Sequence, residues 1–193
     1  MAAQFLEAVR KGDRAAVDRM LDADPSLASA RDERGTSAVL LAHYYGKTEV
    51  AAALLSRTPT LDVFEAAAAG DAKRVAALVD ADRSLANAVA RDGYTPLGLA
   101  SFFKRREVVK ALLDRGAKPS VPSRDLGFTP LHSAVATDAA GSEGDIVRLL
   151  LEAGADPNAT DPRSLTPLDI ARDRRNVEVA ALLHRTVTNR KRV

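Results

Sequence analysis

Apolar residues recur at helical spacing in short segments of the chain, and several of these segments end at a glycine. The clearest examples are EVVKALLDRGAK and DIVRLLLEAGAD, which contain Gly116 and Gly154. Glycine suits the left-handed conformation that often follows the last turn of a helix. The pattern therefore predicts short helices. A coiled coil is excluded, because Gly, Pro and Asp interrupt the apolar pattern at short intervals.

A second phrase precedes these segments and predicts a further set of helices. Its variants are GTSAVLLAHYYG, GYTPLGLASFFK, GFTPLHSAVATD and RSLTPLDIARDRR. The threonines of Thr95-Pro96, Thr129-Pro130 and Thr166-Pro167 can accept hydrogen bonds from free amides at a helix start. Proline at the first helical position loses no bond that it would have made. Each unit is thus predicted as helix, turn, helix and loop.

The chain also repeats over a longer distance. Aligning FLEAVRKGDRAAVDRMLDADPSLASA with VFEAAAAGDAKRVAALVDADRSLANA matches identical residues at a constant offset of 58. The pairs include Glu7/Glu65, Ala8/Ala66, Gly12/Gly70, Asp13/Asp71, Val17/Val75 and Asp22/Asp80, and later Glu49/Glu107, Val50/Val108, Leu54/Leu112 and Leu55/Leu113. A duplicated pair of shorter units explains this offset.

Helices of about ten residues are marginal in water when isolated, so their stability must come from stacking. Two columns of residues at equivalent positions would form the contacts between units. One is small (Ala8, Ala42, Ala66, Ala100, Ala134, Ala171) and the other large (Met20, Leu54, Leu78, Leu112, Leu150, Leu183). The sequence therefore predicts an all-α fold, an α-solenoid of stacked helix-turn-helix units.

The phrase GFTPLHSAVATD, followed by DIVRLLLEAGADPNA, resembles the ankyrin repeat, whose pattern is G-x-T-P-L-H-x-A-A and then L-L-x-x-G-A-D-x-N. The resemblance implies a single ankyrin repeat domain over residues 1–185, with repeats joined by hairpin-like loops. It is followed by a basic tail at 186–193. The expected repeats lie near 3–31, 32–60, 61–89, 90–123, 124–160 and 161–185.

The sequence departs from the family pattern at several places. Lys104, Ser164 and Arg175 stand where glycines are usual. The connection SRTPTLDVF is too short for the usual hairpin finger, which we expect to be missing or collapsed; its effect on the curvature of the superhelix stays open. The fifth repeat carries extra residues near 137–144, either as a surface loop or as a partner contact.

Eight aromatic residues occur in the chain, and four of them form two matched adjacent pairs, Tyr44-Tyr45 and Phe102-Phe103. Consecutive helical residues are about 100° apart, so both rings of a pair cannot point into the core. Phe102 lies roughly 200° from Ala100, and we expect it to face away from the stack, as Tyr44 should. Phe103 and Tyr45 lie nearer the flank.

In the family that the chain resembles, the first helices and the hairpin tips form a concave face that binds partners. Carried over position by position, this implies a partner-binding set of Tyr44, Tyr45, Arg91, Asp92, Tyr94, Phe102, Phe103, Asp125, Leu126, Phe128 and Arg163. Exposed rings often mark interaction sites. The alternative is that these rings fill the space between units as packing residues.

Composition narrows the possible functions further. The chain has no cysteine and no apolar run long enough to span a membrane, so we expect a cytoplasmic protein without a membrane segment. Its formal charge is +2, but four basic residues lie in the last nine. Without them, 24 basic face 26 acidic residues, so we do not expect nucleic-acid binding.

No catalytic or metal-binding motif stands out. His132 belongs to the TPLH phrase, for which the resemblance implies a structural role, while His43 and His184 lack partners at metal-ligand or triad spacing. No phosphate-binding, nucleophile-elbow or zinc-protease motif is present. We therefore expect neither an enzyme nor a cofactor.

Together these observations predict a monomeric, non-enzymatic module that binds a partner protein through the concave face. The alternative is an assembly or stabilising subunit that uses the convex side or the caps of the stack. The sequence does not identify the partner, because the recognition positions are the ones that the fold leaves free.

Overall fold

The computed structural model describes residues 1–58, 60–136 and 143–190. Within this part the chain is helical, with a single isolated bridge between Arg31 and Ser37, which confirms the predicted all-α class. The helices are α1 (Ala2–Lys11), α2 (Arg14–Ala23), α3 (Ala38–Tyr44), α4 (Thr48–Arg57), α5 (Val63–Ala69), α6 (Ala72–Ala81), α7 (Pro96–Phe102), α8 (Arg106–Leu113), α9 (Pro130–Val135), α10 (Glu143–Glu152), α11 (Pro167–Asp173) and α12 (Val177–Arg190), with 3₁₀ helices η1 (Pro25–Ser29) and η2 (Arg83–Asn87).

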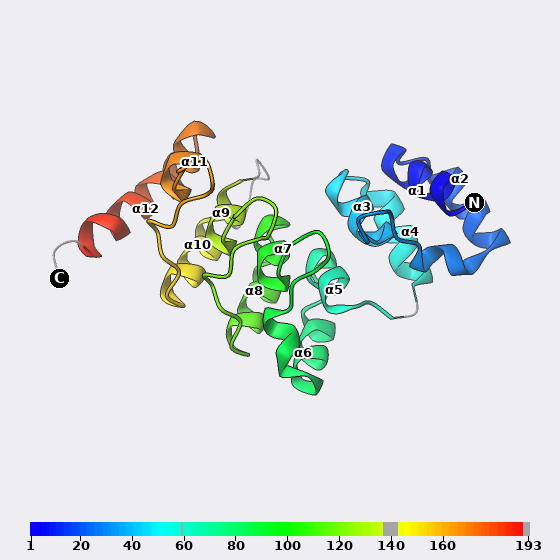
Figure 1. The fold of residues 1–193 in the computed structure, drawn as a ribbon, viewed down its shortest axis with the longest axis horizontal. Coiled ribbons are helices and arrows are strands. Elements are labelled where there is room, and N and C mark those ends of the chain that lie inside the picture. The colour runs from blue at the N-terminus through cyan, green and yellow to red at the C-terminus, as the bar shows by residue number, and fades with distance from the viewer. Residues whose placement is uncertain (59, 137–142, 191–193) are drawn as a thin grey trace.

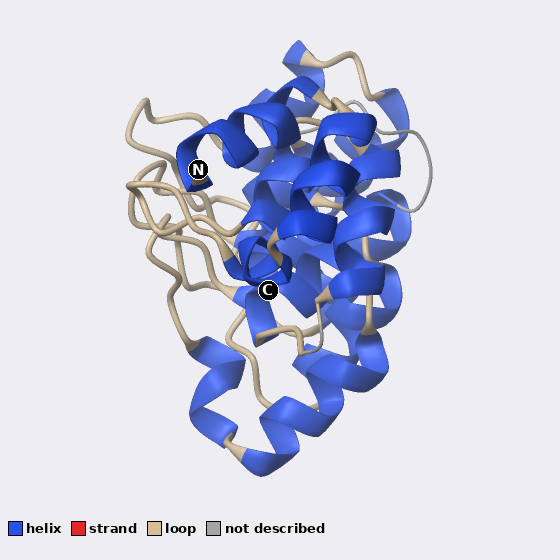
Figure 2. Cartoon of the chain, turned by 90° about the vertical axis from the view of Figure 1, so that its right-hand side faces the viewer, coloured by secondary structure: helices blue, strands red, loops and turns tan. Residues whose placement is uncertain are grey.

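The helices form pairs that stack side by side into a solenoid (Figure 1). Each odd-numbered helix packs on the next helix in the chain and on the odd-numbered helices of neighbouring pairs. Two layers result, and long loops gather on one side of the helices (Figure 2). Because each helix is short, these contacts between pairs supply the stability that the individual helices lack.

The helix starts follow the predicted capping chemistry. The Thr95 side chain accepts a hydrogen bond from the Gly98 amide at 3.0 Å, and Thr166 accepts one from Asp169 at 3.2 Å. Ser37, which has no proline after it, caps α3 in the same way. The sequence therefore determines the first turn of these helices through local hydrogen bonds.

The residues after the helices also behave as predicted where glycine is present, since Gly116 and Gly154 have φ angles of +86° and +94°. The three positions that depart from glycine adopt the same left-handed region: Lys104 has φ 58°, Ser164 63° and Arg175 55°. A side chain in this region costs about 1–2 kcal/mol, because its Cβ crowds the following carbonyl. The substituted units thus keep the family geometry at a local cost.

We expect Arg175→Gly to stabilise the protein by about 1 kcal/mol, because glycine relieves the left-handed strain and loses part of the gain to unfolded-chain entropy. Urea unfolding followed by circular dichroism measures the change. Arg174→Gly is the matched control: its φ of −81° is ordinary, so glycine there should lower stability. Equal effects of the two variants would contradict a role for strain.

The stack changes at the connection between α4 and α5. The other pairs are separated by long loops, whereas only residues 58–62 join these two helices, and the described ones form no hairpin. The expected loss of a finger is confirmed for this connection. The buried core divides at the same place into one cluster from α1–α4 and a second from α5–α12, to which Leu40 of α3 also belongs.

The two layers differ at this junction. In the inner layer α3 packs on α5, so the odd-numbered helices form a continuous series. In the outer layer the extensively packed pairs are α2 with α4, α6 with α8, α8 with α10, and α10 with α12, and α4 with α6 is missing from this series. Figure 1 shows α1–α4 and α5–α12 as two groups of helices at this point. Contacts of the inner layer and its loops must therefore join the two groups.

The two remaining segments that the sequence set apart are only partly described. The tail expected at 186–193 begins inside α12, which continues to Arg190. Its last residues, 191–193, lie outside the described residues, as do 137–142 of the extra residues in the fifth repeat.

Candidate protein-binding surface

Four of the predicted aromatic residues pack into one group that we call the aromatic cluster: Tyr44, Tyr94, Phe102 and Phe103. The ring centroids of Phe102 and Phe103 are 5.0 Å apart, and those of Tyr44 and Phe103 are 5.4 Å apart. Tyr44 lies 6.3 Å from Tyr94 and 6.2 Å from Phe102. These separations are typical of interacting aromatic pairs. The cluster therefore connects α3 with α7 and the loop before α7.

The helix between these two elements explains how the rings meet. α5 packs on both α3 and α7, and at the positions matching the two aromatic pairs it carries Ala68 and Ala69. Ala68 is fully buried. Because alanine fills little space, the larger rings on either side reach each other across this unit. The two aromatic pairs that match in sequence thus contact each other in the structure.

Solvent exposure separates the members of the predicted set. Tyr44, Tyr94, Phe102 and Phe103 are half-buried, and they partly cover one another. Tyr45 is 53% exposed, although helix geometry placed Tyr44, not Tyr45, on the face away from the stack. Leu126, at the tip of the fifth repeat, is 48% exposed. Packing between units accounts for the cluster, while Tyr45 and Leu126 are exposed to solvent.

A groove of about 630 Å³ runs beside the cluster. It contains six of the predicted binding residues together with five others that come from α1, α3 and the loop of the second repeat. The lining residues are Arg10, Asp32, Arg34, Thr36, Leu41, Tyr44, Tyr45, Asp92, Tyr94, Asp125 and Leu126. We call this feature the groove.

Loops far apart in sequence form the outer wall of the groove. The Arg34 side chain pairs with Asp125 at 2.8 Å. The loop that carries Arg34 also contacts the third repeat, since Arg31 pairs with Asp62 at 2.9 Å. This loop thus contacts the short connection between α4 and α5, where the finger is missing. Because Arg34 is largely exposed, its ion pair contributes little stability, about 1 kcal/mol or less.

Inside the groove, the Tyr44 hydroxyl donates a hydrogen bond to Asp92 Oδ2 at 3.0 Å. Burial, the charge of Asp92 and this hydrogen bond raise the pKa of Tyr44 far above its ordinary value. Burial and the charges of Asp92 and Asp125 also raise the pKa of Tyr94. Both phenols therefore stay protonated and can donate hydrogen bonds.

The remaining predicted residues lie outside the groove. Arg91 lines a neighbouring depression, where its side chain lies against Gly35. Phe128 stacks on His132 with 5.6 Å between ring centroids. Arg163 pairs with Asp161 at 3.0 Å in the loop of the last repeat. The groove thus unites six predicted positions of the second, fourth and fifth repeats, while Arg91, Phe128 and Arg163 lie apart from it.

His132 has the structural role that the resemblance implies. It is fully buried, and its Nδ1 lies 2.8 Å from the Thr129 hydroxyl. Nε2 lies 3.1 Å from the Leu165 carbonyl oxygen, to which a protonated nitrogen donates. The side chain therefore ties the start of α9 to the next loop.

His43 lies at the back of the aromatic cluster, 5.6 Å from Phe103 between ring centroids. Its Nε2 is buried, and no described residue forms a hydrogen bond with it. Burial, and then the charge of Arg105, lower the pKa of His43 to about 4. Arg105 is held in place because its Nε donates to the Ala68 carbonyl at 2.8 Å. A neutral histidine is thus part of the junction between the two groups of helices.

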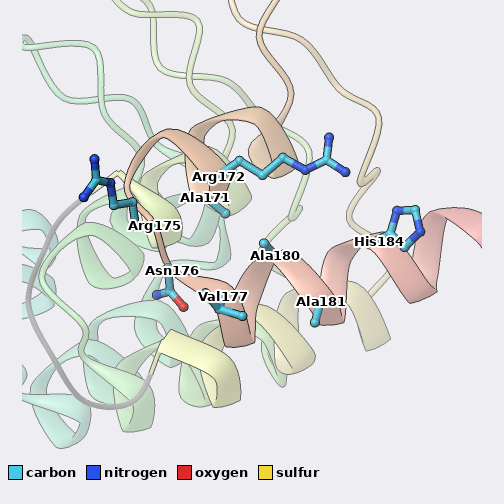
Figure 3. Close-up of a pocket in the computed structure, with 8 residues that line it drawn as sticks. All are labelled: Ala171, Arg172, Arg175, Asn176, Val177, Ala180, Ala181 and His184. Carbon is cyan, nitrogen blue, oxygen red and sulfur yellow. The ribbon is translucent and has the colours of Figure 1, made fainter.

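A second pocket, of about 610 Å³, lies at the C-terminal end of the stack and we call it the terminal pocket. Figure 3 shows Ala171, Val177, Ala180 and Ala181 lining it between α11 and α12, with arginines at its edge. Val177 is 79% exposed. The pocket thus lies on the last helix pair of the stack.

Two further kinds of site are absent from the described residues. No group of three or more His, Asp or Glu side chains there is arranged to hold a metal ion. Among the described helices, none combines the length and the apolar character that crossing a bilayer requires.

The family model described as "Ankyrin repeats (3 copies)" matches residues 5–123 and, in a second overlapping match, residues 63–161. Similar curated proteins include the putative ankyrin repeat protein FPV031 of fowlpox virus, 42% identical over 95 residues, which are 47% of this chain and 27% of that protein. The putative ankyrin repeat protein YahD of Escherichia coli is 38% identical over 98 residues, or 50% of this chain and 49% of YahD.

A 55-residue stretch, 28% of this chain, is 51% identical to the bovine tRNA endonuclease ANKZF1, of which it covers 7%. The chain therefore matches less than half the length of each of these relatives. The family model, by contrast, covers most of the described repeats, and their capped helix pairs have the geometry of its motif. This chain belongs to the ankyrin repeat family.

Proposed function

We propose that this chain is a non-enzymatic, cytoplasmic module that binds a partner protein through the groove and the concave face around it. Ankyrin repeats are in general protein-interaction modules, and their solenoids offer extended concave surfaces for binding. We expect the chain to act as a monomer toward this partner. The proposal that the partner binds in the groove depends on the side chains that line it.

The observation that supports the groove is the placement of exposed apolar groups. In the described part of the chain, Tyr45 and Leu126 are two of five large apolar side chains that are exposed. They come from different repeats and line the same groove. Tyrosine is common at the centre of interfaces, where it combines a large apolar ring with a polar end. The half-buried aromatic cluster beneath would keep such a surface in a fixed shape.

A photo-cross-linking amino acid placed at Tyr45 should capture a defined partner from extracts of the native source, whereas one at Lys110 should not. Lys110 lies exposed on the outer helix α8 and is the matched control. Leu126→Asp should weaken binding of the captured partner roughly tenfold, because it places a charge in the apolar part of the interface. Calorimetric titration with the purified partner measures the loss.

Capture from Lys110 but not from Tyr45 would contradict the assignment to the groove. Circular dichroism of Leu126→Asp provides the folding control, and it should show no change because this side chain is exposed.

The terminal pocket supports the alternative, an assembly or stabilising subunit that uses a cap of the stack. Four of its eight lining residues are alanine or valine, and the exposed Val177 is among them, which favours a contact with another protein chain. If the partner binds here, Val177→Asp removes binding and Leu126→Asp does not. The two variants therefore distinguish the two functions.

A further inference from the structure

The charged residues of the groove do not balance. Its lining contains two arginines, Arg10 and Arg34, against three aspartates. Arg10 pairs with Asp32 at 3.2 Å, and Arg34 pairs with Asp125 at 2.8 Å. Asp92 is left without an ion pair among the described residues. The groove therefore carries one uncompensated negative charge, located at Asp92.

The groups that donate hydrogen bonds to Asp92 are neutral. The Tyr44 hydroxyl donates to Oδ2, and the Tyr94 amide lies 3.4 Å from Oδ1. Arg91 is next in sequence, but its side chain lies along Gly35 and makes no ion pair in the described structure. A half-buried carboxylate is stabilised most by a cation, because hydrogen bonds from neutral groups do not balance its charge. Asp92 can therefore still form an ion pair with a cation.

The rings around Asp92 suit the same kind of partner. Tyr44, Tyr45 and Tyr94 line the groove together with the carboxylate. Aromatic rings attract cations through their electron-rich faces, and a guanidinium can also stack on them. At about 630 Å³ the groove has room for a long side chain, and its exposed members Tyr45 and Leu126 leave it open to solvent.

We propose that the groove binds an arginine or lysine side chain of the partner protein, with Asp92 as its ion-pair acceptor and the three tyrosines around its alkyl chain. This inference rests on the proposed function, because it assigns chemistry to the partner that the groove binds. A partner segment whose anchor is acidic or phosphorylated does not fit, since it would meet an excess of carboxylates.

The test selects peptides of random sequence, displayed on phage, against the immobilised full chain. The selected peptides should share a basic residue, and its replacement by citrulline or glutamine, which are uncharged, should weaken binding roughly tenfold or more. Asp92→Asn should cause a similar loss. The asparagine oxygen can still accept from Tyr44, so the fold should persist. Asp114→Asn, which alters an exposed carboxylate on the outer side, is the matched control and should bind as the wild type does.

Each other outcome is decisive. Selected peptides without a shared basic residue, peptides insensitive to Asp92→Asn, or a selection that yields no binder would overturn the basic anchor. The proposed function fails separately: it is lost if binding also ignores Tyr45→Ala and Leu126→Asp. Peptides that respond to those two variants but not to Asp92→Asn leave the groove as the binding site and remove only the charged anchor.

Discussion

Replacing Tyr44 and Phe102 together by alanine is expected to lower the free energy of unfolding by about 3 kcal/mol. Both rings belong to the aromatic cluster, which joins α3 to α7 where the outer layer of helices is interrupted. Their loss removes apolar contacts between the two groups of helices. In a solenoid, stability is the sum of terms within and between repeats, so a weakened junction should also separate the unfolding of α1–α4 from that of α5–α12.

Urea unfolding with hydrogen exchange on individual amides measures both effects. We expect amides of α3 and α4 to exchange before those of α7 and α8 in the double variant. Tyr45→Ala is the matched control: this ring is exposed and outside the cluster, so its removal should change stability by about 0.5 kcal/mol or less. A double variant as stable as Tyr45→Ala would mean that the cluster contributes nothing to the junction.

The structural role of the aromatic cluster also limits which residues can be mutated to test binding. A variant that removes cluster rings changes the shape of the groove, so lost binding would not identify a contact. Tyr45 and Leu126 are exposed and can be changed without that effect. Tyr45 therefore allows the binding interpretation of the aromatic residues to be tested without disturbing the packing of the cluster.

The local parts of the fold could be predicted from sequence because short-range chemistry determines them. Thr95 and Thr166 cap helices through hydrogen bonds to amides three residues away. Gly116 and Gly154 follow helices in a conformation that glycine adopts at low cost. The repeat pattern then limits how such helices can stack. None of these inferences requires knowledge of distant residues.

The candidate site depends on distant residues, and sequence reasoning reached it only in part. The pair formed by Arg34 and Asp125 joins residues 91 positions apart. It forms where the finger between α4 and α5 is missing, and no pattern in the sequence predicts how neighbouring loops fill that space. Asp32 and Leu41 also line the groove and were not predicted. The resemblance did identify some groove residues, such as Asp92, because the hairpin tips on which they lie also line the groove.

The exposure of the aromatic pairs shows a second limit. Helix geometry predicted Tyr44 and Phe102 to face outward and was less decisive for Tyr45 and Phe103. α3 and α7 end at Tyr44 and Phe102, so the second ring of each pair is a cap residue to which helical periodicity no longer applies. Phe103 then packs on Tyr44 of the other pair, while Tyr45 has no such partner ring in the described structure. The two duplicated positions differ because their neighbours differ.

Acidification is expected to destabilise the protein by about 3 kcal/mol through His43 alone. Burial, and then Arg105, lower the pKa of His43 to about 4 in the folded protein, whereas an unfolded histidine has a pKa near 6.5. Above the unfolded value both states are neutral, and the full stability is present. As pH falls from 6.5 to 4, the unfolded state binds a proton that the folded state resists, and unfolding becomes easier. Below 4 both states are protonated and no further loss follows.

Urea unfolding between pH 7.5 and 3.5 measures this effect as the difference between the wild type and His43→Gln, which cannot gain the proton. The comparison with His43→Gln is needed because burial also lowers the pKa of His132. His132 therefore destabilises both proteins on acidification, and its effect cancels in the difference between them. Parallel stability curves would show that His43 does not carry a depressed pKa. If instead the curves converge on acidification, their difference measures the cost of protonating a buried imidazole that also lies near the charge of Arg105.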